Sequence, residues 1–294
     1  MRILVTGVTG QVGGALVSRL AGRHTVTAAA RDTLDLSRPD AIAGQLDGLA
    51  PDLIINSAAY TAVDQAEDER DVAFTINAEG PAAIARWAAA RRVPLVQLST
   101  DYVFDGSGER AWREDDEPRP LSVYGASKLA GETAVRGAGG PHLVVRTCWV
   151  YAATGRNFLR TIARLAGERP ELRIVADQIG APTPAGVIAD GIARMLPDDV
   201  AAAPERFAAA GGVVHLATAG ATSWHGFAVA IVEGLRARHA DIKVERIVPI
   251  RTEDYPTKAV RPRNSRLDLG RLAQVFGIVT PGWAAALDPV LNQL

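Results

Sequence analysis

The sequence predicts an α/β protein in which a doubly wound parallel sheet is accompanied by a smaller α/β lobe. Two observations carry this prediction. Short apolar, β-branched runs alternate with longer segments of helical period through the first half of the 294 residues. The runs are almost continuously hydrophobic, as expected of parallel strands that helices cover on both faces.

The first half largely alternates expected strands with expected helices. The expected strands are Ile3–Thr6, His24–Ala29, Leu53–Asn56, Leu95–Ser99 and Leu143–Thr147. The expected helices are Val12–Leu20, Pro81–Arg91 and Leu129–Val135. This order corresponds to repeated βα units around one sheet.

The pattern becomes less regular after about Thr147. Pro-rich turns at Ala181–Pro184 and Pro249–Pro262 accompany expected helices such as Ala185–Met195 and Trp224–Arg238. The Ala-rich stretch Ala201–Ala210 is interpreted as surface. Val213–Leu216 has the pattern of one more strand returning to the main sheet. We therefore expect residues 1–150, with a returning segment near 185–220, to form mainly the cofactor-binding domain. Residues 151–294 are expected to form mainly the substrate-binding lobe.

Composition excludes several kinds of partner. Lys and Arg total 32 against 33 for Asp and Glu, so no excess positive charge is available for nucleic acid or an anionic membrane. Cys148 is the only cysteine, which rules out an intrachain disulfide and favours a buried thiol in a reducing compartment. The histidines lack zinc-ligand spacing, and no metal is expected. The N-terminus resembles a strand rather than a signal peptide, so we expect a cytoplasmic protein.

A glycine-rich turn follows the first expected strand. Gly7, Gly10 and Gly13 lie between that strand and the first helix, with Gln11 and Val12 in the same turn. A dinucleotide pyrophosphate requires close approach of the backbone and helix N-terminal N–H groups that point at its charge. The position of the motif, more than its pattern, predicts a dinucleotide-binding site of the Rossmann type.

The end of the second expected strand bears on the choice of nicotinamide cofactor. It has no carboxylate to bind a free ribose, and Arg31 is placed to pair with a 2′-phosphate. NADPH is therefore favoured, with NADH possible, and Arg31 as an ordinary solvated arginine is the alternative. Asp35 and Leu36 are expected to flank the adenine, although Asp35 could equally cap the next turn.

The most specific signal is the pair Tyr124 and Lys128. Residues four apart share one face of a helix, so the two side chains are expected to project to the same place. A nearby ammonium favours the phenolate and would lower the pKa of Tyr124, making it a usable general acid or base. The pair predicts proton transfer at a carbonyl or alcohol.

Further candidates follow the third and fourth expected strands, because ligands bind beyond the carboxyl ends of strands in such sheets. Thr100 is the third catalytic candidate, with a role as a turn cap as its alternative. Ala58, Ala59, Tyr60 and Asn77 are expected to line the nicotinamide side. Helix capping is the competing interpretation for these.

Taken together, the motifs resemble the extended short-chain dehydrogenases and, within them, the dTDP-4-dehydrorhamnose reductases. The resemblance covers essentially the whole chain. It rests on TGVTGQVG at 6–13, AAYTAVDQAE at 58–67, STDYVFDG at 99–106, PLSVYGASKLAGE at 120–132, DQIGAPT at 177–183 and RPRNSRLD at 261–268.

The resemblance implies hydride transfer from NADPH, or sometimes NADH, to the C4 ketone of dTDP-4-dehydro-L-rhamnose, which yields dTDP-L-rhamnose. Tyr124 would then donate a proton, Lys128 would hold the nicotinamide ribose and Thr100 would bind the ketone. The residues implied to contact the dTDP-sugar are Thr100, Asp101, Trp149, Gln178, Arg261, Asn264 and Ser265.

One departure from the family concerns assembly. Some members dimerise around magnesium held by three glutamates, and the matching positions here are Ala15, Gly186 and Ala284. A monomer, or a homodimer without a metal bridge, is expected instead. The residues leave open the oligomeric state, the nucleotide of the sugar donor and docking to an upstream epimerase.

Two alternative functions remain open at this point. A sugar-nucleotide epimerase or dehydratase would use the same Tyr and Lys pair with tightly bound NAD. A non-catalytic regulatory subunit, similar to the one associated with methionine adenosyltransferase, would keep the fold as a binding module. Product analysis separates the first alternative, and turnover itself separates the second.

Overall fold

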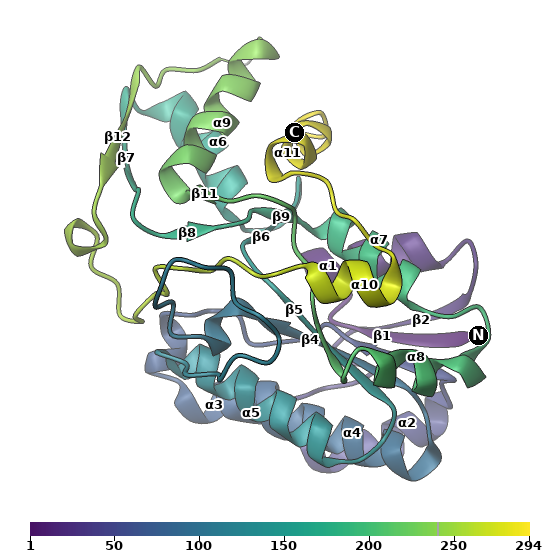
Figure 1. Cartoon of the computed structure of the whole chain (residues 1–294). Coiled ribbons are helices and arrows are strands. Elements are labelled where there is room, and N and C mark those ends of the chain that lie inside the picture. Colours follow the sequence, from purple (N-terminus) through teal and green to yellow (C-terminus); the bar gives the residue numbers. More distant parts are fainter. Residues whose placement is uncertain (240) are drawn as a thin grey trace.

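The computed structural model describes residues 1–239 and 241–294. Within them, six parallel strands form one sheet in the order β10-β5-β4-β3-β1-β2. Figure 1 labels β1, β2, β4 and β5 of this sheet. The predicted doubly wound α/β fold is confirmed. The strands of this sheet are β1 (Arg2–Thr6), β2 (Thr25–Ala29), β3 (Leu53–Asn56), β4 (Leu95–Thr100), β5 (His142–Thr147) and β10 (Val213–His215).

Helices cover both faces of the sheet. Both faces carry apolar side chains, because successive residues of a strand point to opposite sides. Ile3 and Val5 of β1 pack in one apolar core, whereas Leu4 between them packs in another. The helices of the first core are α1 (Gln11–Leu20), α7 (Ala185–Met195), α8 (Ala203–Ala209) and α10 (Gly270–Phe276). Those of the second are α2 (Pro39–Leu49), α4 (Gly80–Arg91) and α5 (Val123–Gly137).

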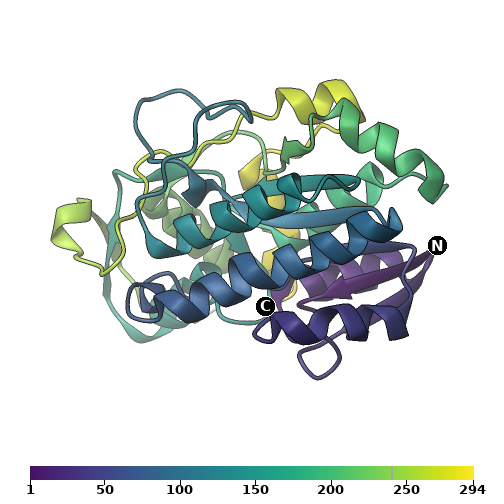
Figure 2. The same cartoon turned by 90° about the horizontal axis from the view of Figure 1, so that it is seen from below.

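The second face carries a long helical stretch that lies beside α5 (Figure 2, blue and teal). It runs from α3 (Arg70–Phe74) through a π-helical turn, η2 (Thr75–Glu79), into α4. A Cβ added to Gly131 of α5 would lie 2.1 Å from the carbonyl oxygen of Asn77. Glycine therefore permits the close approach of α5 to η2.

The smaller lobe is built on the parallel pair β7 and β12, which α6, α9 and α11 cover with a third apolar core (Figure 1). Two short pairs, β6 with β9 and β8 with β11, accompany it. The strand bounds are β6 (Val150–Tyr151), β7 (Glu171–Val175), β8 (Ile179–Gly180), β9 (Thr183–Pro184), β11 (Thr222–Ser223) and β12 (Arg246–Ile250). The helix bounds are α6 (Phe158–Glu168), α9 (Trp224–Ala237) and α11 (Trp283–Leu291).

The chain crosses between the two parts more than once. Helix α7 and strand β10 return to the main sheet, where β10 pairs with β5. The expectation that Ala201–Ala210 is merely a surface stretch is wrong, because most of it forms α8. Ala203 and Phe207, four residues apart on one helix face, are buried in the first core.

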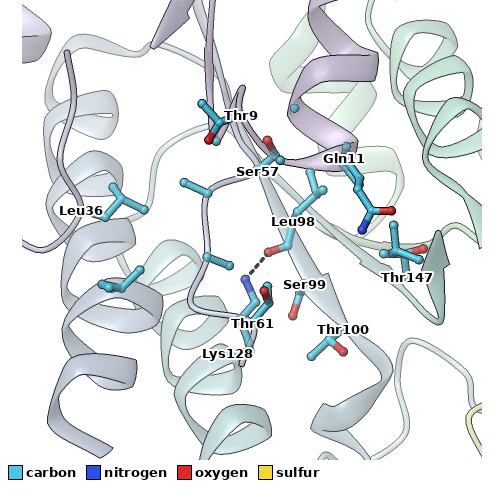
Figure 3. A pocket seen from close by; sticks show the side chains of 18 of the residues that line it. Thr9, Gln11, Leu36, Ser57, Thr61, Leu98, Ser99, Thr100, Lys128 and Thr147 are labelled. Atoms are coloured by element: carbon cyan, nitrogen blue, oxygen red, sulfur yellow. Dashed lines mark hydrogen bonds between the residues drawn. The ribbon is translucent and has the colours of Figure 1, made fainter. Parts of the chain in front are cut away.

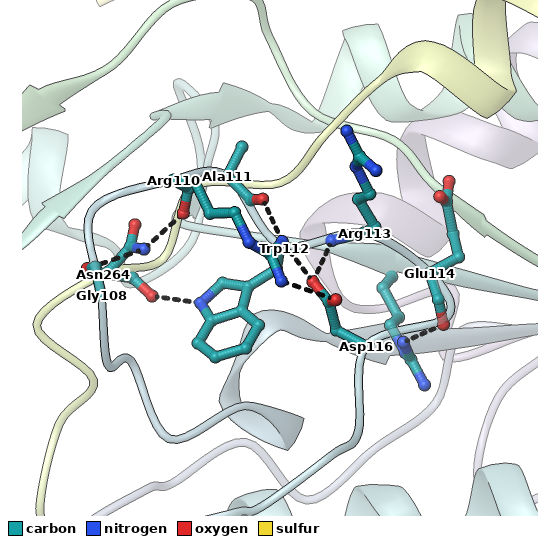
Figure 4. A network of polar contacts seen from close by, with 9 residues as sticks. Gly108, Arg110, Ala111, Trp112, Arg113, Glu114, Asp116 and Asn264 are labelled. Carbon is teal, nitrogen blue, oxygen red and sulfur yellow. Dashed lines mark hydrogen bonds and ion pairs between the residues drawn. The ribbon is translucent and has the colours of Figure 1, made fainter.

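A segment near the C-terminus, residues 262–268, runs between the two lobes, and we name it the strap. On one side the backbone N–H of Ile179 in β8 donates to the carbonyl of Arg263 at 2.8 Å. On the other side the N–H of Asp268 donates to the carbonyl of Trp112 at 2.7 Å. The strap therefore joins β8 to the loop that follows β4. Figure 4 shows the contacts of Asn264 in the strap with that loop.

Candidate active site

The predicted glycine turn forms a cradle between β1 and α1. Gly7 has a φ of 66°, in the left-handed region that glycine adopts without strain. A Cβ on Gly13 would lie only 2.2 Å from the carbonyl oxygen of Gly7. Gly10 is the N-cap of α1 and has no side chain to cover the first N–H groups of the helix. The cradle is therefore open to an anionic group at the positive end of α1.

A cavity of about 640 Å³ extends from this cradle along the carboxyl ends of the strands (Figure 3). Its size lies within the range of about 300–1,000 Å³ that is usual for small-molecule sites. The predicted residues that line it are Gly7, Gly10, Gln11, Val12, Gly13, Arg31, Asp35, Leu36, Ala58, Ala59, Thr100, Asp101, Tyr124, Lys128 and Trp149.

One end of the cavity lies at the tip of β2. Arg31 is exposed there, so its guanidinium is accessible to a phosphate. Asp35 also lines the cavity, and its Oδ1 accepts hydrogen bonds from the backbone N–H and the hydroxyl of Ser37 at 2.9 and 2.8 Å. Asp35 thus caps its turn and faces the cavity at the same time. The cradle and this end together fit a dinucleotide with a 2′-phosphate.

The other end of the cavity holds Tyr124 and Lys128, which α5 presents from its first two turns. Ser122 caps the helix, its hydroxyl accepting the N–H of Gly125 at 3.2 Å. A Cβ on Gly125 would lie 2.2 Å from the carbonyl oxygen of Tyr102, so glycine lets α5 begin close to the turn that follows β4. Lys128 is buried, and its Nζ donates to the carbonyl oxygen of Leu98 at 2.7 Å (Figure 3).

Thr100 ends β4, and both interpretations of it have support. Its Oγ1 accepts the backbone N–H of Tyr102 at 3.2 Å, which caps the following 3-10 turn, η3 (Asp101–Val103). The same hydroxyl donates to Oδ1 of Asp101 at 3.0 Å and lines the cavity. Thr100 therefore fixes the turn after β4 and holds Asp101 in place.

Burial controls the protonation of these groups. It raises the pKa of Tyr124 to about 12, and a hydrogen bond with Thr100 offsets only part of this effect. The expected lowering of the Tyr124 pKa by Lys128 is therefore wrong for this structure. Burial lowers the pKa of Lys128 to about 8, against the attraction of Glu132. At neutral pH Tyr124 is a neutral phenol, which is the form that donates a proton during ketone reduction.

Asp101 is also almost completely buried, with one oxygen left without a hydrogen-bond partner among the described residues. Burial raises its pKa to about 6, although Ser265 and Thr100 stabilise the carboxylate. The carboxylate lines the cavity next to Thr100. It is placed to accept a hydrogen bond from a bound hydroxyl.

Tyr60 and Asn77, which were expected to line the nicotinamide side, instead support the wall of the cavity. Asn77 is buried, and its side chain accepts the N–H of Tyr60 at 2.8 Å and donates to the hydroxyl of Ser127 at 3.0 Å. The phenol of Tyr60 donates to Glu69 at 2.7 Å. Asn77 thereby fixes the segment after β3 against α5, rather than capping a helix.

The four expected substrate contacts from the second half also make protein contacts. Arg261 forms a bidentate pair with Asp64, with N···O distances of 2.6 and 3.0 Å. The Gln178 side chain accepts from the indole of Trp224 at 3.1 Å. Asn264 in the strap donates to the carbonyl of Arg110 at 2.7 Å (Figure 4).

Ser265, the fourth of these residues, is buried in the strap, where its N–H donates to the carbonyl of Ile179 at 2.7 Å. None of the four lines the cavity among the residues described. They join the segments that surround it.

Many residues of the cavity wall were not predicted from the sequence, and Trp224 and Thr147 are two of them. The Trp224 ring stacks on Trp149 with centroids 3.6 Å apart and an angle of 10° between the rings. Trp149 itself has a φ of 48°, a strained value for a residue other than glycine. Thr147 lies at the end of β5, and its place at the carboxyl end of an expected strand was the signal that could have found it. Trp224 gave no such signal, because it begins a distant helix.

These features define a class of protein. A glycine cradle at the start of α1, a Tyr–Lys pair on α5 and a hydroxyl at the end of β4 surround one cavity. They are the parts of a nicotinamide-dependent oxidoreductase of the short-chain dehydrogenase type, in which the protein orients the cofactor and transfers a proton.

Comparisons with known proteins identify the family. The family model described as the RmlD substrate binding domain matches residues 1–294. A dTDP-4-dehydrorhamnose reductase of Burkholderia thailandensis is 50% identical over 100% of this chain and 99% of the relative. The enzyme of that name from Shigella flexneri is 41% identical over 100% and 98%.

A solved structure of dTDP-4-dehydrorhamnose reductase from Bacillus anthracis, in complex with NADP, superposes with a TM-score of 0.90. It is 33% identical, over 100% of this chain and 99% of that one. The chain therefore belongs to the dTDP-4-dehydrorhamnose reductase family. The predicted function, that of a reductase with NADP(H) as its cofactor, is confirmed, and the epimerase and regulatory-subunit alternatives are not favoured.

Two further findings concern metals and membranes. In the described part of the chain, His, Cys, Asp and Glu side chains do not gather in groups of three or more that could hold a metal ion. Over the same residues, every helix is too short or too polar to cross a membrane.

Proposed function

We propose that this protein reduces the C4 ketone of dTDP-4-dehydro-L-rhamnose to dTDP-L-rhamnose, with Tyr124 as the proton donor. The observation that carries the proposal is a partly buried phenol, neutral at pH 7, in the same cavity as a dinucleotide cradle. When bound, NADPH supplies the hydride for the ketone carbon. Tyr124 supplies the proton for the ketone oxygen and is left as a phenolate.

Lys128 has two roles in this proposal. Its ammonium, held by the Leu98 carbonyl, is placed to bind ribose hydroxyls with its two remaining N–H groups. The same charge stabilises the phenolate that forms on Tyr124 during the reaction. Because burial lowers the pKa of Lys128 to about 8, we expect turnover to fall as the pH rises through that value.

Thr100 binds the ketone oxygen together with Tyr124. A hydroxyl has one hydrogen to donate, and that of Thr100 is directed at Asp101 in this structure. Thr100 therefore turns its hydrogen from Asp101 to the ketone when substrate binds. Asp101, released from Thr100, then accepts a hydroxyl of the sugar.

The remaining predicted residues have two kinds of role, which follow from their contacts in the structure. Trp149, stacked on Trp224, provides an aromatic wall for the sugar nucleotide. Gln178, Arg261, Asn264 and Ser265 act by positioning the segments around the substrate, since each already has protein partners. In this proposal residues 1–150, with the returning segment near 185–220, bind the cofactor, and residues 151–294 mainly bind the substrate.

The assembly and location follow the same proposal. The positions where some relatives hold magnesium are Ala15, Gly186 and Ala284, which have no metal-binding groups. We propose a monomer or a homodimer without a metal bridge, acting in the cytoplasm without nucleic acid or membrane partners. A single buried cysteine, Cys148, and the balanced net charge support this location.

The test follows NADPH oxidation with enzymatically prepared dTDP-4-dehydro-L-rhamnose and identifies the sugar product. The wild type is expected to turn over, and Tyr124→Phe to lose activity about 10²- to 10⁴-fold with NADPH affinity nearly unchanged. Substantial activity in Tyr124→Phe would overturn the proton-donor role. NADPH binding without any turnover by the wild type would overturn the proposed reaction.

A further inference from the structure

The hydroxyl of Thr147 is buried in the cavity wall, where the described part of the chain offers it no hydrogen-bond partner. Thr147 is the last residue of β5 and is only 6% exposed. Its Oγ1 has no hydrogen-bond partner among the residues that the structure describes. The side chain lines the cavity (Figure 3). Burial of an unpartnered hydroxyl costs free energy, which a ligand that bonds to it would recover.

On the neighbouring strand, the hydroxyl at the paired position has hydrogen-bond partners within the protein. Thr100 of β4 is the register partner of Thr147, and both side chains stand on the same face of the sheet. The Thr100 hydroxyl is engaged twice, by Asp101 and by the N–H of Tyr102. Of these two paired threonines, only Thr147 has a hydroxyl without a hydrogen-bond partner among the described residues.

The surroundings of Thr147 narrow the kind of group that it binds. Leu98 of β4 and Val150 of β6 contribute apolar surface to the lining of the same cavity. The glycine cradle lies at the start of α1, and Tyr124 marks where the reaction takes place. A flat apolar ring with a single polar substituent, bound between the pyrophosphate and the reacting carbon, matches this lining. The nicotinamide ring of the cofactor has that structure.

We propose that the Thr147 hydroxyl binds the carboxamide of the nicotinamide and thereby fixes the orientation of the ring. The inference rests on the proposed placement of NADPH in this cavity. A hydroxyl can donate to the carboxamide oxygen or accept from its amino group, so it suits this group in either orientation. Because the carboxamide lies to one side of the ring, anchoring it determines which ring face is turned toward the substrate. Thr147 is in this sense a positioning residue for hydride transfer.

The test compares two ligands in Thr147→Val, a substitution that keeps the shape of the side chain and removes the hydroxyl. NADPH carries the nicotinamide, whereas adenosine 2′,5′-bisphosphate lacks it. We expect the dissociation constant of NADPH, measured by calorimetry, to rise about three- to tenfold, as for loss of one neutral hydrogen bond. The constant for adenosine 2′,5′-bisphosphate is expected to stay unchanged. Thr147→Ser, which keeps the hydroxyl, should bind NADPH like the wild type.

Thermal unfolding separates this role from a structural one. Since the hydroxyl has no protein partner, Thr147→Val is expected to unfold at the wild-type temperature or above it. Thr280→Val is the matched control, because Thr280 is also buried with an unpartnered hydroxyl among the described residues but does not line the cavity. It should leave the binding of both ligands unchanged.

The outcomes are distinguishable from failure of the proposed function. Unchanged NADPH affinity in Thr147→Val, or equal weakening of both ligands, overturns the role of the hydroxyl. Absence of NADPH binding by the wild type would overturn the proposed cofactor site itself. Selective weakening of NADPH, with normal binding by Thr147→Ser, supports the inference.

Discussion

Helix α5 carries two buried charges one turn apart, and their surroundings differ sharply. Glu132 is 1% exposed and accepts bonds from Arg146 at 2.6, 2.9 and 3.2 Å, so both charges are paired. Lys128, 4% exposed, has one protein acceptor, the Leu98 carbonyl, among the described residues. A buried charge on this helix face has a structural role where the protein supplies its ion-pair partner, as for Glu132. It is available for reaction where some of its hydrogen-bond donors have no protein acceptor, as for Lys128.

The same distinction applies across the end of the sheet. Asp101, Ser99 and Thr147 each bury a polar atom that has no partner within the described chain, and all three line the cavity. A buried polar group left in this state destabilises the free protein and binds a ligand more strongly for that reason. Within the cavity wall, these unsatisfied groups are available to a ligand, whereas the satisfied pair of Glu132 and Arg146 belongs to the scaffold.

The largest effect is expected for Lys128→Met. Removal of the ammonium should lower turnover about 10²- to 10⁴-fold, because the ribose contact and the charge beside Tyr124 are lost together. The free energy of unfolding should change by only about 1 kcal/mol, since a single hydrogen bond is lost and a costly buried charge is relieved. Steady-state kinetics and urea unfolding measure the two quantities. Lys243→Met, at an exposed lysine, is the control and should alter neither.

Glu132→Gln is expected to show the opposite pattern. It leaves Arg146 buried without its charge partner, and should lower the free energy of unfolding by about 3–5 kcal/mol. Urea unfolding checks this value against Glu168→Gln, whose exposed pair with Arg164 should contribute at most about 1 kcal/mol. Equal losses in the two variants would remove the distinction between a buried scaffold pair and a surface pair.

Asp101→Asn tests the unsatisfied carboxyl through its pH dependence. Burial raises the pKa of Asp101 from 3.8 to about 6, so between these values the folded protein binds more protons than the unfolded chain. The stability that this group contributes is present below about pH 4 and lost as the pH rises through about 6. Relative to the wild type, the variant should therefore gain about 1–3 kcal/mol between about pH 4 and 7.

Asp105 provides the matched comparison for that measurement. Hydrogen bonds from Ser107 lower the pKa of Asp105, so its stabilising contribution is present at neutral pH and lost on acidification. Asp105→Asn should therefore change the pH profile of unfolding in the opposite direction. A common direction for the two variants would contradict the assigned pKa shifts.

The smallest effect is expected for Arg31→Ala, which extends the comparison to an exposed charge of the same cavity. Its contact with a 2′-phosphate would be solvated, so we expect about a tenfold weaker affinity for NADPH. The affinity for NADH, which lacks that phosphate, should remain as in the wild type. Calorimetry with the two cofactors makes the measurement. Equal changes for both would remove Arg31 from 2′-phosphate recognition.

Much of the cofactor half could be predicted from local patterns. The glycine turn at Gly7–Gly13 and the spacing of Tyr124 and Lys128 are local, because a turn or a helix face is set by residues a few positions apart. The smaller lobe was harder. Its strands β7 and β12 pair over a separation of some 75 residues along the chain, from Glu171 to Arg246, and neither has a distinctive local signature.

The sequence by itself determined the fold class, the cradle and the identity of the Tyr–Lys pair, since each depends on periodicity or on short spacing. Only the tertiary structure decided which side chains face the cavity. The side chains of Asn77, Gln178 and Asn264 form hydrogen bonds within the protein, whereas those of Trp224 and Thr147 line the cavity. The direction in which the pKa of Tyr124 shifts also depended on the tertiary structure. Burial depends on what distant segments place around a group, and no local pattern encodes that surrounding.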